Sequence, residues 1–244
     1  MFRFLIISLS CVILCGCQGK KDKTIILSKA GDNYIKWIED ENIVVLDAYT
    51  INNTDSILNL ADGIILTGGE DINPLLYNDS SNLAVCETIN HRRDSIEQKL
   101  FDFAFRHKIP LMGVCRGMQM MNVATGGSLY GDLPSEIGIE VIHRNNGEVM
   151  HDIVVTDTCS LIFPFKKDTF KVNSWHHQGL KDISACLQVV AKSHDGLAEA
   201  VVMDKALHPF MIAVQFHPER LGKEDPIHLQ MRNSFHKAIG YQKK

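Results

Sequence analysis

The sequence predicts a single α/β domain with a central, mostly parallel sheet, helices on both faces and a small antiparallel extension. Short apolar runs alternate with helix-like segments from residue 24 onward, which is the pattern of parallel strands joined by right-handed crossovers. Glycine-rich turns or polar side chains follow three of these runs, as they do at the ligand-binding edge of such sheets. A length of 244 residues, 45% of them hydrophobic, suits one domain with a substantial core.

The N-terminus differs in kind from the rest of the chain. Arg3 precedes an apolar run from Phe4 to Leu14, which is too short to cross a bilayer as a helix but is typical of a signal peptide. The run ends in Leu14-Cys-Gly-Cys17, which looks like a bacterial lipobox; a plain signal peptide cleaved nearby is the alternative. We expect an exported lipoprotein, anchored through Cys17 to a membrane of a bacterial cell envelope. The expected parts are a signal peptide (1–16), the lipidated cysteine with a polar tether (17–23) and one domain (24–244).

The first part of the domain alternates strand and helix, which is how a parallel sheet begins. In chain order we expect a strand at Thr24–Leu27, a helix around Tyr34–Asp40, a strand at Ile43–Leu46, a short helix capped by Asn53 or Thr54 and ending at Leu60, and a strand that runs into Gly68-Gly69. After this turn, Asn90 begins a longer amphipathic helix through His107.

The turn at Gly68-Gly69 has a chemical interpretation. A tight glycine turn exposes backbone amides, and the amide of Gly69 together with that of Arg116 would form a pair of donors for a tetrahedral oxyanion. An ordinary turn at the end of a strand is the alternative.

The stretch from Ile109 to Gly127 is the most informative part of the chain. A short apolar run leads into Gly113-Val-Cys-Arg-Gly117, and a helix-like segment follows. G-x-C-x-G is the sulfur counterpart of the nucleophile elbow, in which small flanking residues leave the middle side chain exposed. Cys115 would lie at a helix N-terminus, where unpaired amides, the helix dipole and Arg116 favour the reactive thiolate. A buried core cysteine is the alternative.

The next elements are shorter and alternate in polarity. Turn signals at Gly131–Pro134 precede them, and His143 and His151 are expected to serve structure. We expect strands near 151–156, 169–173, 187–192 and 197–203, and a last helix from about 226 to 239.

The loop from Asn173 to Gly179 holds two adjacent histidines. His176 and His177 compete with His217 for the role of catalytic base, and we treat His177 as a pocket residue. Adjacent histidines can also bind a metal, but no Cys or His at ligand-like spacing flanks them, so no metal site is predicted.

The apolar run from Phe210 delivers His217 at its end, with Glu219 two residues further on. A thiol nucleophile needs a base, and the base needs an orienting group. His217 can take the proton of Cys115, and Glu219 can hold the other ring nitrogen and stabilise the imidazolium. A strand-end histidine beside a solvated Glu is the alternative. If all three groups lie at strand ends, they meet on one edge of the sheet.

Three motifs in this order resemble the class I glutamine amidotransferase-like family: Thr-Gly-Gly at 67–69, Gly-Val-Cys-Arg-Gly-Met-Gln at 113–119 and Gln-Phe-His-Pro-Glu at 215–219. The match is closer to its free-standing gamma-glutamyl hydrolase branch, through the stretches 66–74, 92–94, 126–129 and 172–178. The resemblance covers nearly all of the chain beyond about residue 24.

This resemblance implies a flavodoxin-like domain that hydrolyses a small gamma-glutamyl amide through a thioester, with Cys115, His217 and Glu219 as the triad and no cofactor. It places Gln119 in the pocket for the glutamyl head group; capping of a neighbouring loop is the alternative. It also makes Arg93 a candidate for holding a substrate carboxylate, because Arg suits such groups geometrically. A solvated arginine at the start of the helix is the alternative.

Composition and context limit the other functions. A formal net charge of −4 without a basic stripe argues against a nucleic-acid partner. A glutaminase subunit that supplies ammonia would use the same triad, but we expect neither a synthetase domain nor an ATP-driven partner for an exported chain. A non-catalytic binding protein that has kept the pocket is the third possibility. The sequence selects neither the leaving amine nor the oligomeric state, which leaves a homodimer open, and no pairing of Cys86, Cys159 and Cys186 is predicted.

Overall fold

The computed structural model describes residues 22–241. The predicted signal peptide, the lipidation site at Cys17 and most of the tether lie outside the described residues. Within residues 22–241, no helix has the length and apolar character needed to cross a membrane.

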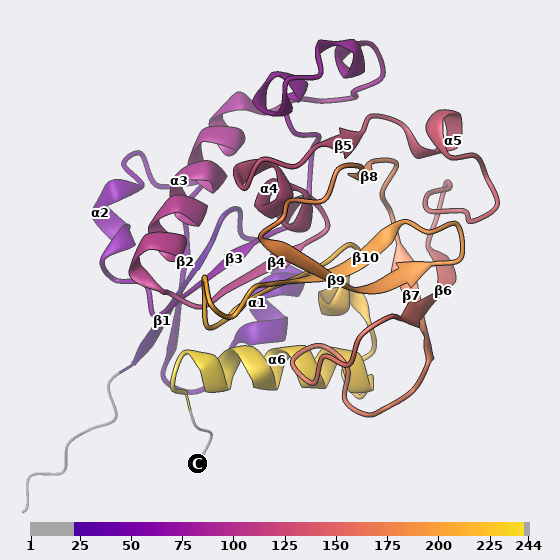
Figure 1. Cartoon of the computed structure of the whole chain (residues 1–244). Coiled ribbons are helices and arrows are strands. Elements are labelled where there is room, and N and C mark those ends of the chain that lie inside the picture. The colour runs from indigo at the N-terminus through magenta and orange to yellow at the C-terminus, as the bar shows by residue number, and fades with distance from the viewer. Residues whose placement is uncertain (1–21, 242–244) are drawn as a thin grey trace, which may run out of the picture.

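A nine-stranded sheet runs through the whole domain in the order β2-β1-β3-β4-β11-β10-β9-β6-β7 (Figure 1). Its first five strands are parallel neighbours, and the order 2-1-3-4 is that of flavodoxin-like sheets. These strands are β1 (Lys23–Leu27), β2 (Ile43–Asp47), β3 (Gly63–Leu66), β4 (Leu111–Val114) and β11 (Met211–Val214). The predicted fold class is confirmed.

The remaining strands continue the same sheet with antiparallel pairing. They are β6 (Val149–Val155), β7 (Thr169–Ser174), β9 (Leu187–Ser193) and β10 (Ala198–Met203). This part is larger than the small extension expected from the sequence, because all four strands join the main sheet. A separate two-stranded sheet pairs β5 (Leu129–Tyr130) with β8 (Gly179–Leu180), which were not predicted.

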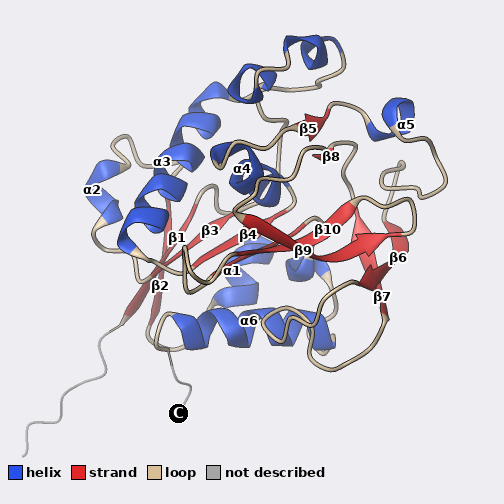
Figure 2. Cartoon of the chain, viewed as in Figure 1, coloured by secondary structure: helices blue, strands red, loops and turns tan. Residues whose placement is uncertain are grey.

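Helices cover both faces of the sheet (Figure 2). One face packs against α1 (Asp32–Ile38) and α6 (Pro226–Ala238), and the other packs against α2 (Asp55–Leu58), α3 (His91–His107) and α4 (Arg116–Ala124). A short helix, α5 (Leu133–Glu136), follows β5. Asn90, where the sequence predicts the long helix to begin, caps it, since its side chain accepts a hydrogen bond from the amide of Arg93 at 3.1 Å.

Three neighbouring strands end together at one edge of the sheet. Leu66 of β3 pairs with Gly113 of β4, and Val114 of β4 pairs with Val214 of β11. The segments that follow these strands carry Gly68, Cys115 and His217, and these segments therefore lie side by side. The parallel half of the fold thus brings segments about 50 and 100 residues apart in sequence to one place.

Candidate active site

Cys115 lies in a strained turn between β4 and α4. Its backbone has φ 52° and ψ −107°, a conformation that residues with a side chain rarely adopt. The two glycines of G-x-C-x-G explain how the turn is packed. A Cβ on Gly113 would lie 2.8 Å from the backbone of Gly117, and a Cβ on Gly117 would collide with the carbonyl of Leu66. Strand and helix therefore approach closely only because both positions are glycine.

The side chains of Cys115 and His217 are joined by a hydrogen bond, and Glu219 completes the line. Nδ1 of His217 lies 2.8 Å from Oε1 of Glu219, whose carboxylate is buried. The three predicted triad residues are thus brought together in the expected order. Because the carboxylate can only accept at Nδ1, the other ring nitrogen, Nε2, is the one that exchanges a proton with the sulfur.

Electrostatics favour a charged imidazole at this position. Burial alone would lower the pKa of His217, but the negative charge of the Cys115 thiolate and the hydrogen bond that the ring donates to Glu219 raise it to about 10. The imidazolium form of His217, which serves as the general acid, is therefore favoured at neutral pH.

Two residues that the sequence did not assign to the site hold His217 in place. The side chain of Asn173 accepts from the amide of His217 at 2.8 Å and donates to its carbonyl at 3.0 Å. The ring of Trp175 meets the imidazole edge-on, with 5.3 Å between centroids. Both lie in the stretch 173–179, which the sequence marked for its histidines rather than for these neighbours.

The turn after β3 packs directly against the triad. A Cβ on Gly68 would lie 2.7 Å from Cε1 of His217 and 3.5 Å from Cβ of Cys115, so only glycine fits there. The amide of Gly68 already donates to the hydroxyl of Tyr34 at 2.8 Å. The neighbouring amide of Gly69 and the first amide of α4, that of Arg116, are the donors left for an oxyanion.

Arg93 supports this turn from behind. Its guanidinium donates to the carbonyls of Thr67 and Gly68 at 2.8 Å each, and it pairs with Glu70 and Glu97. The side chain is 1% exposed and does not line the cavity at Cys115. The geometry therefore places Arg93 in the support of the oxyanion turn rather than in contact with a substrate carboxylate, because its donors are already engaged.

A cavity of about 230 Å³ opens beside the nucleophile. Among the predicted site residues, Gly69, Cys115, Gln119 and His177 line it. Gln119 donates from Nε2 to the carbonyl of Gln178 at 3.2 Å, which ties α4 to the loop after β7. His177 bridges Asp71 and Asp132 at 3.2 and 3.5 Å, and these contacts raise the pKa of its ring although burial opposes the change. Further polar residues complete the cavity wall, among them Glu70, Glu87 and Arg144.

Comparison with known proteins gives a consistent picture. The family model Peptidase C26 matches residues 16–219. Protein NtpR of Enterococcus hirae is 37% identical over 182 residues, which are 72% of this chain and 74% of that protein. Gamma-glutamyl-gamma-aminobutyrate hydrolase PuuD of Escherichia coli is 34% identical over 176 residues, which are 68% of this chain and 66% of that protein.

Solved structures with little sequence identity share the fold. A glutamine amidotransferase of Thermotoga maritima superposes with a TM-score of 0.60 at 15% identity, covering 91% of this chain and 99% of that one. The glutaminase domain of Trypanosoma brucei CTPS with bound acivicin gives 0.60 at 16% identity, covering 92% of this chain and 96% of that one.

Proposed function

The chain belongs to the Peptidase C26 family, within the class I glutamine amidotransferase-like group, and we propose that it hydrolyses gamma-glutamyl amide bonds through a thioester on Cys115. The observation that carries the proposal is the hydrogen-bonded line Cys115–His217–Glu219 beyond the carboxyl ends of the adjacent parallel strands β4 and β11. The relative from Escherichia coli is named for such a hydrolysis, which favours this substrate class over other acyl groups.

The reaction follows from the positions of these groups. Sγ of Cys115 attacks the side-chain carbonyl carbon of the glutamyl group, and the amides of Gly69 and Arg116 receive the developing oxyanion. The imidazolium of His217 gives its proton to the departing amine as the carbon–nitrogen bond breaks. A water molecule then attacks the thioester while His217 takes its proton, which releases glutamate and restores the thiolate.

Substrate recognition is assigned to the cavity wall. We place the glutamyl head group against Gln119 and His177, whose side chains line the space next to Cys115. Nε2 of Gln119 donates to the carbonyl of Gln178 and, at 3.4 Å, to the side-chain oxygen of Gln215. A residue fixed in this way presents a constant surface to the invariant part of the substrate, whereas the leaving amine would point toward the open side.

A comparison of substrates tests the proposed function. Purified protein is expected to release free amine from gamma-glutamyl amines or gamma-glutamyl dipeptides with a kcat/KM at least about tenfold above that for glutamine. The measurement is amine release by mass spectrometry, with the matching alpha-glutamyl dipeptides as controls. Preference for glutamine would instead support the glutaminase alternative, and no turnover of any glutamyl amide would contradict the proposal.

Replacing Glu219 with glutamine is expected to move the alkaline limb of the pH profile to lower pH. The limb reports loss of the imidazolium proton of His217, whose pKa of about 10 depends in part on the charge of Glu219. Removing that charge lowers this pKa, so the general acid is lost at a lower pH. The measurement is kcat/KM from pH 6 to 11, with the exposed Glu224→Gln as control. An unchanged limb would show that Glu219 does not tune the base.

We further propose that the protein is exported and held at a membrane through a lipid on Cys17, with the domain in water. The lipobox-like sequence Leu14-Cys-Gly-Cys17 supports this location. Labelling with a fatty acid, compared between the natural chain and Cys17→Ala, tests it; equal labelling of both would refute it.

A further inference from the structure

A second cluster of polar side chains is buried beside the cavity, which one of them, His176, helps to line, and it takes no part in the proposed chemistry. It consists of His143 in the loop before β6, His151 in β6, His176 in the loop after β7, and Glu199 in β10. His143 is 5% exposed, His176 is 4% exposed and Glu199 is fully buried. Buried groups of this kind need partners that satisfy their charge and hydrogen bonding.

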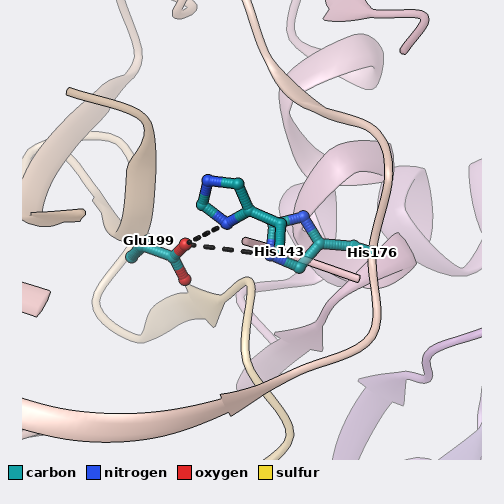
Figure 3. Close-up of side chains that lie close together, drawn as sticks. All are labelled: His143, His176 and Glu199. Atoms are coloured by element: carbon teal, nitrogen blue, oxygen red, sulfur yellow. Dashed lines mark ion pairs between the residues drawn. The ribbon is translucent and has the colours of Figure 1, made fainter. Parts of the chain in front are cut away.

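Two imidazoles face the same carboxylate (Figure 3). Nδ1 of His143 lies 3.5 Å from Oε1 of Glu199, and Nε2 of His176 lies 3.7 Å from the same oxygen. One ligand atom from each of these three residues lies within 4.8 Å of the others. The three side chains come from segments 23 to 56 residues apart in sequence, so no local spacing could have revealed the cluster.

Each of the two rings also has an outer nitrogen, the one that does not face Glu199. The hydrogen bonds of these outer nitrogens determine which ring atoms carry hydrogen. Nδ1 of His176 lies 2.9 Å from the carbonyl of Gln178, which can only accept, so this nitrogen is the donor. Nε2 of His143 lies 2.8 Å from Oδ2 of Asp195. The carboxylate of Asp195 already accepts hydrogen bonds from Ser193 and from the amide of Leu197 through its other oxygen, so we take Oδ2 as the acceptor for the ring N–H of His143. In neutral rings, the nitrogens that face Glu199 therefore carry lone pairs.

Lone pairs that face a carboxylate repel it unless a cation lies between them. Nδ1 of His143, Nε2 of His176 and Oε2 of Glu199 are buried, and none has a hydrogen-bond partner among residues 22–241. Protonating both rings would place two imidazolium ions with centroids 4.8 Å apart in the interior.

We propose that His143, His176 and Glu199 bind a divalent transition-metal ion of the zinc class. Two imidazole nitrogens and one carboxylate oxygen are a common zinc ligand set, whereas Mg²⁺ and Ca²⁺ prefer oxygen ligands throughout. Tetrahedral bonds of about 2.0 to 2.1 Å put ligand atoms about 3.3 to 3.4 Å apart. The separations of 3.5 and 3.7 Å from Oε1 are close to this value, and the three ligand atoms lie within 4.8 Å of one another, so binding draws the side chains inward.

The surrounding residues match what such ligands require. Asp195 and the carbonyl of Gln178 receive the outer N–H groups of the two histidines, as carboxylates and carbonyls do around metal sites. His151 binds Oε1 of Glu199 at 3.1 Å and so orients the carboxylate. A bound ion would tie β10 to the loop that carries His177 and Gln178, and thereby stiffen one wall of the substrate cavity.

Metal content and thermal stability test the site independently of catalysis. The full chain carrying Cys115→Ala, which removes the active-site thiolate as a competing ligand, is loaded with ZnCl₂, desalted and analysed for bound metal. We expect about one zinc ion per chain, a rise in Tm of about 5 °C, and no rise with MgCl₂. In the same background, Glu199→Gln and His143→Gln are expected to lower the bound zinc at least about tenfold.

A matched control and a spectroscopic measurement decide the outcome if a variant folds poorly. His208→Gln replaces another buried histidine, whose ring bonds to Ala104 and Phe210 outside the cluster, and should retain the zinc. X-ray absorption of the loaded protein should show nitrogen and oxygen ligands at about 2.0 Å. No zinc retained after loading together with an unchanged Tm, equal loss in His208→Gln, or sulfur ligands at about 2.3 Å would overturn the proposal.

Discussion

Replacing Cys115 with alanine is expected to lower kcat for gamma-glutamyl amides by at least about 10⁴-fold, with little change in stability. The loss is large because the sulfur is the atom that forms the covalent intermediate, and no other described thiol lines the cavity beside His217. Alanine keeps the Cβ and the strained backbone of the turn, at φ 52°, so the fold should tolerate the change. The measurements are steady-state kinetics and the Tm of both proteins.

Alkylation separates a reactive thiol from a merely buried one. Iodoacetamide at pH 7 is expected to modify Cys115 before Cys159, because burial raises the pKa of the Cys159 thiol and no imidazolium lies against it. Cys159→Ala serves as the control for activity, since it removes a buried thiol away from the cavity. Retained turnover in Cys115→Ala, or alkylation of Cys159 first, would contradict the role of Cys115 as nucleophile.

Much of this arrangement could be predicted from the sequence because its signals are local. Gly113 makes room for the backbone of Gly117 within one strand, turn and helix, so the G-x-C-x-G pattern marks the elbow locally, although Gly117 also makes room for the carbonyl of Leu66 in β3. The same holds for His217 and Glu219, which lie two residues apart and interact directly. The parallel topology then brings these local motifs together, because the carboxyl ends of parallel strands lie at a common edge of the sheet.

The features that the sequence did not reveal depend on contacts between distant segments. Asn173 clamps the backbone of His217 across 44 residues, and nothing in the local pattern of either distinguishes that role. The family resemblance makes Arg93 a candidate ligand for a substrate carboxylate, because Arg suits such groups geometrically. Its burial arises only when α3 packs against α4 and the turn at Gly68. The histidine cluster around Glu199 is hidden for the same reason, since four separate segments supply it.

Replacing Glu97 with glutamine is expected to lower the free energy of unfolding by about 3 to 5 kcal/mol, the largest stability effect that the ion pairs predict. Glu97 is fully buried and lies between two arginines: it pairs with Nε of Arg93 at 2.8 Å and with Arg116 through its other oxygen. Glutamine keeps the shape but not the charge, which leaves two buried guanidinium groups with too little compensation. Burial and the charge of Arg93 already lower the pKa of Arg116 to about 9, which shows how costly its charge is there.

A surface ion pair between α3, the helix that carries Glu97, and α2 supplies the matched control for this prediction. Lys99 and Asp55 pair at 3.0 Å with 45% and 63% of their side chains exposed, so Asp55→Asn should cost less than about 1 kcal/mol. Denaturant unfolding of both variants at pH 7 measures the difference. Because Arg93 also donates to the carbonyls of Thr67 and Gly68, the loss of Glu97 should lower kcat as well, through the turn that carries the oxyanion donor. If Glu97→Gln costs no more than Asp55→Asn, the buried charges do not hold this edge of the sheet together, and the support of the active site must come from apolar packing alone.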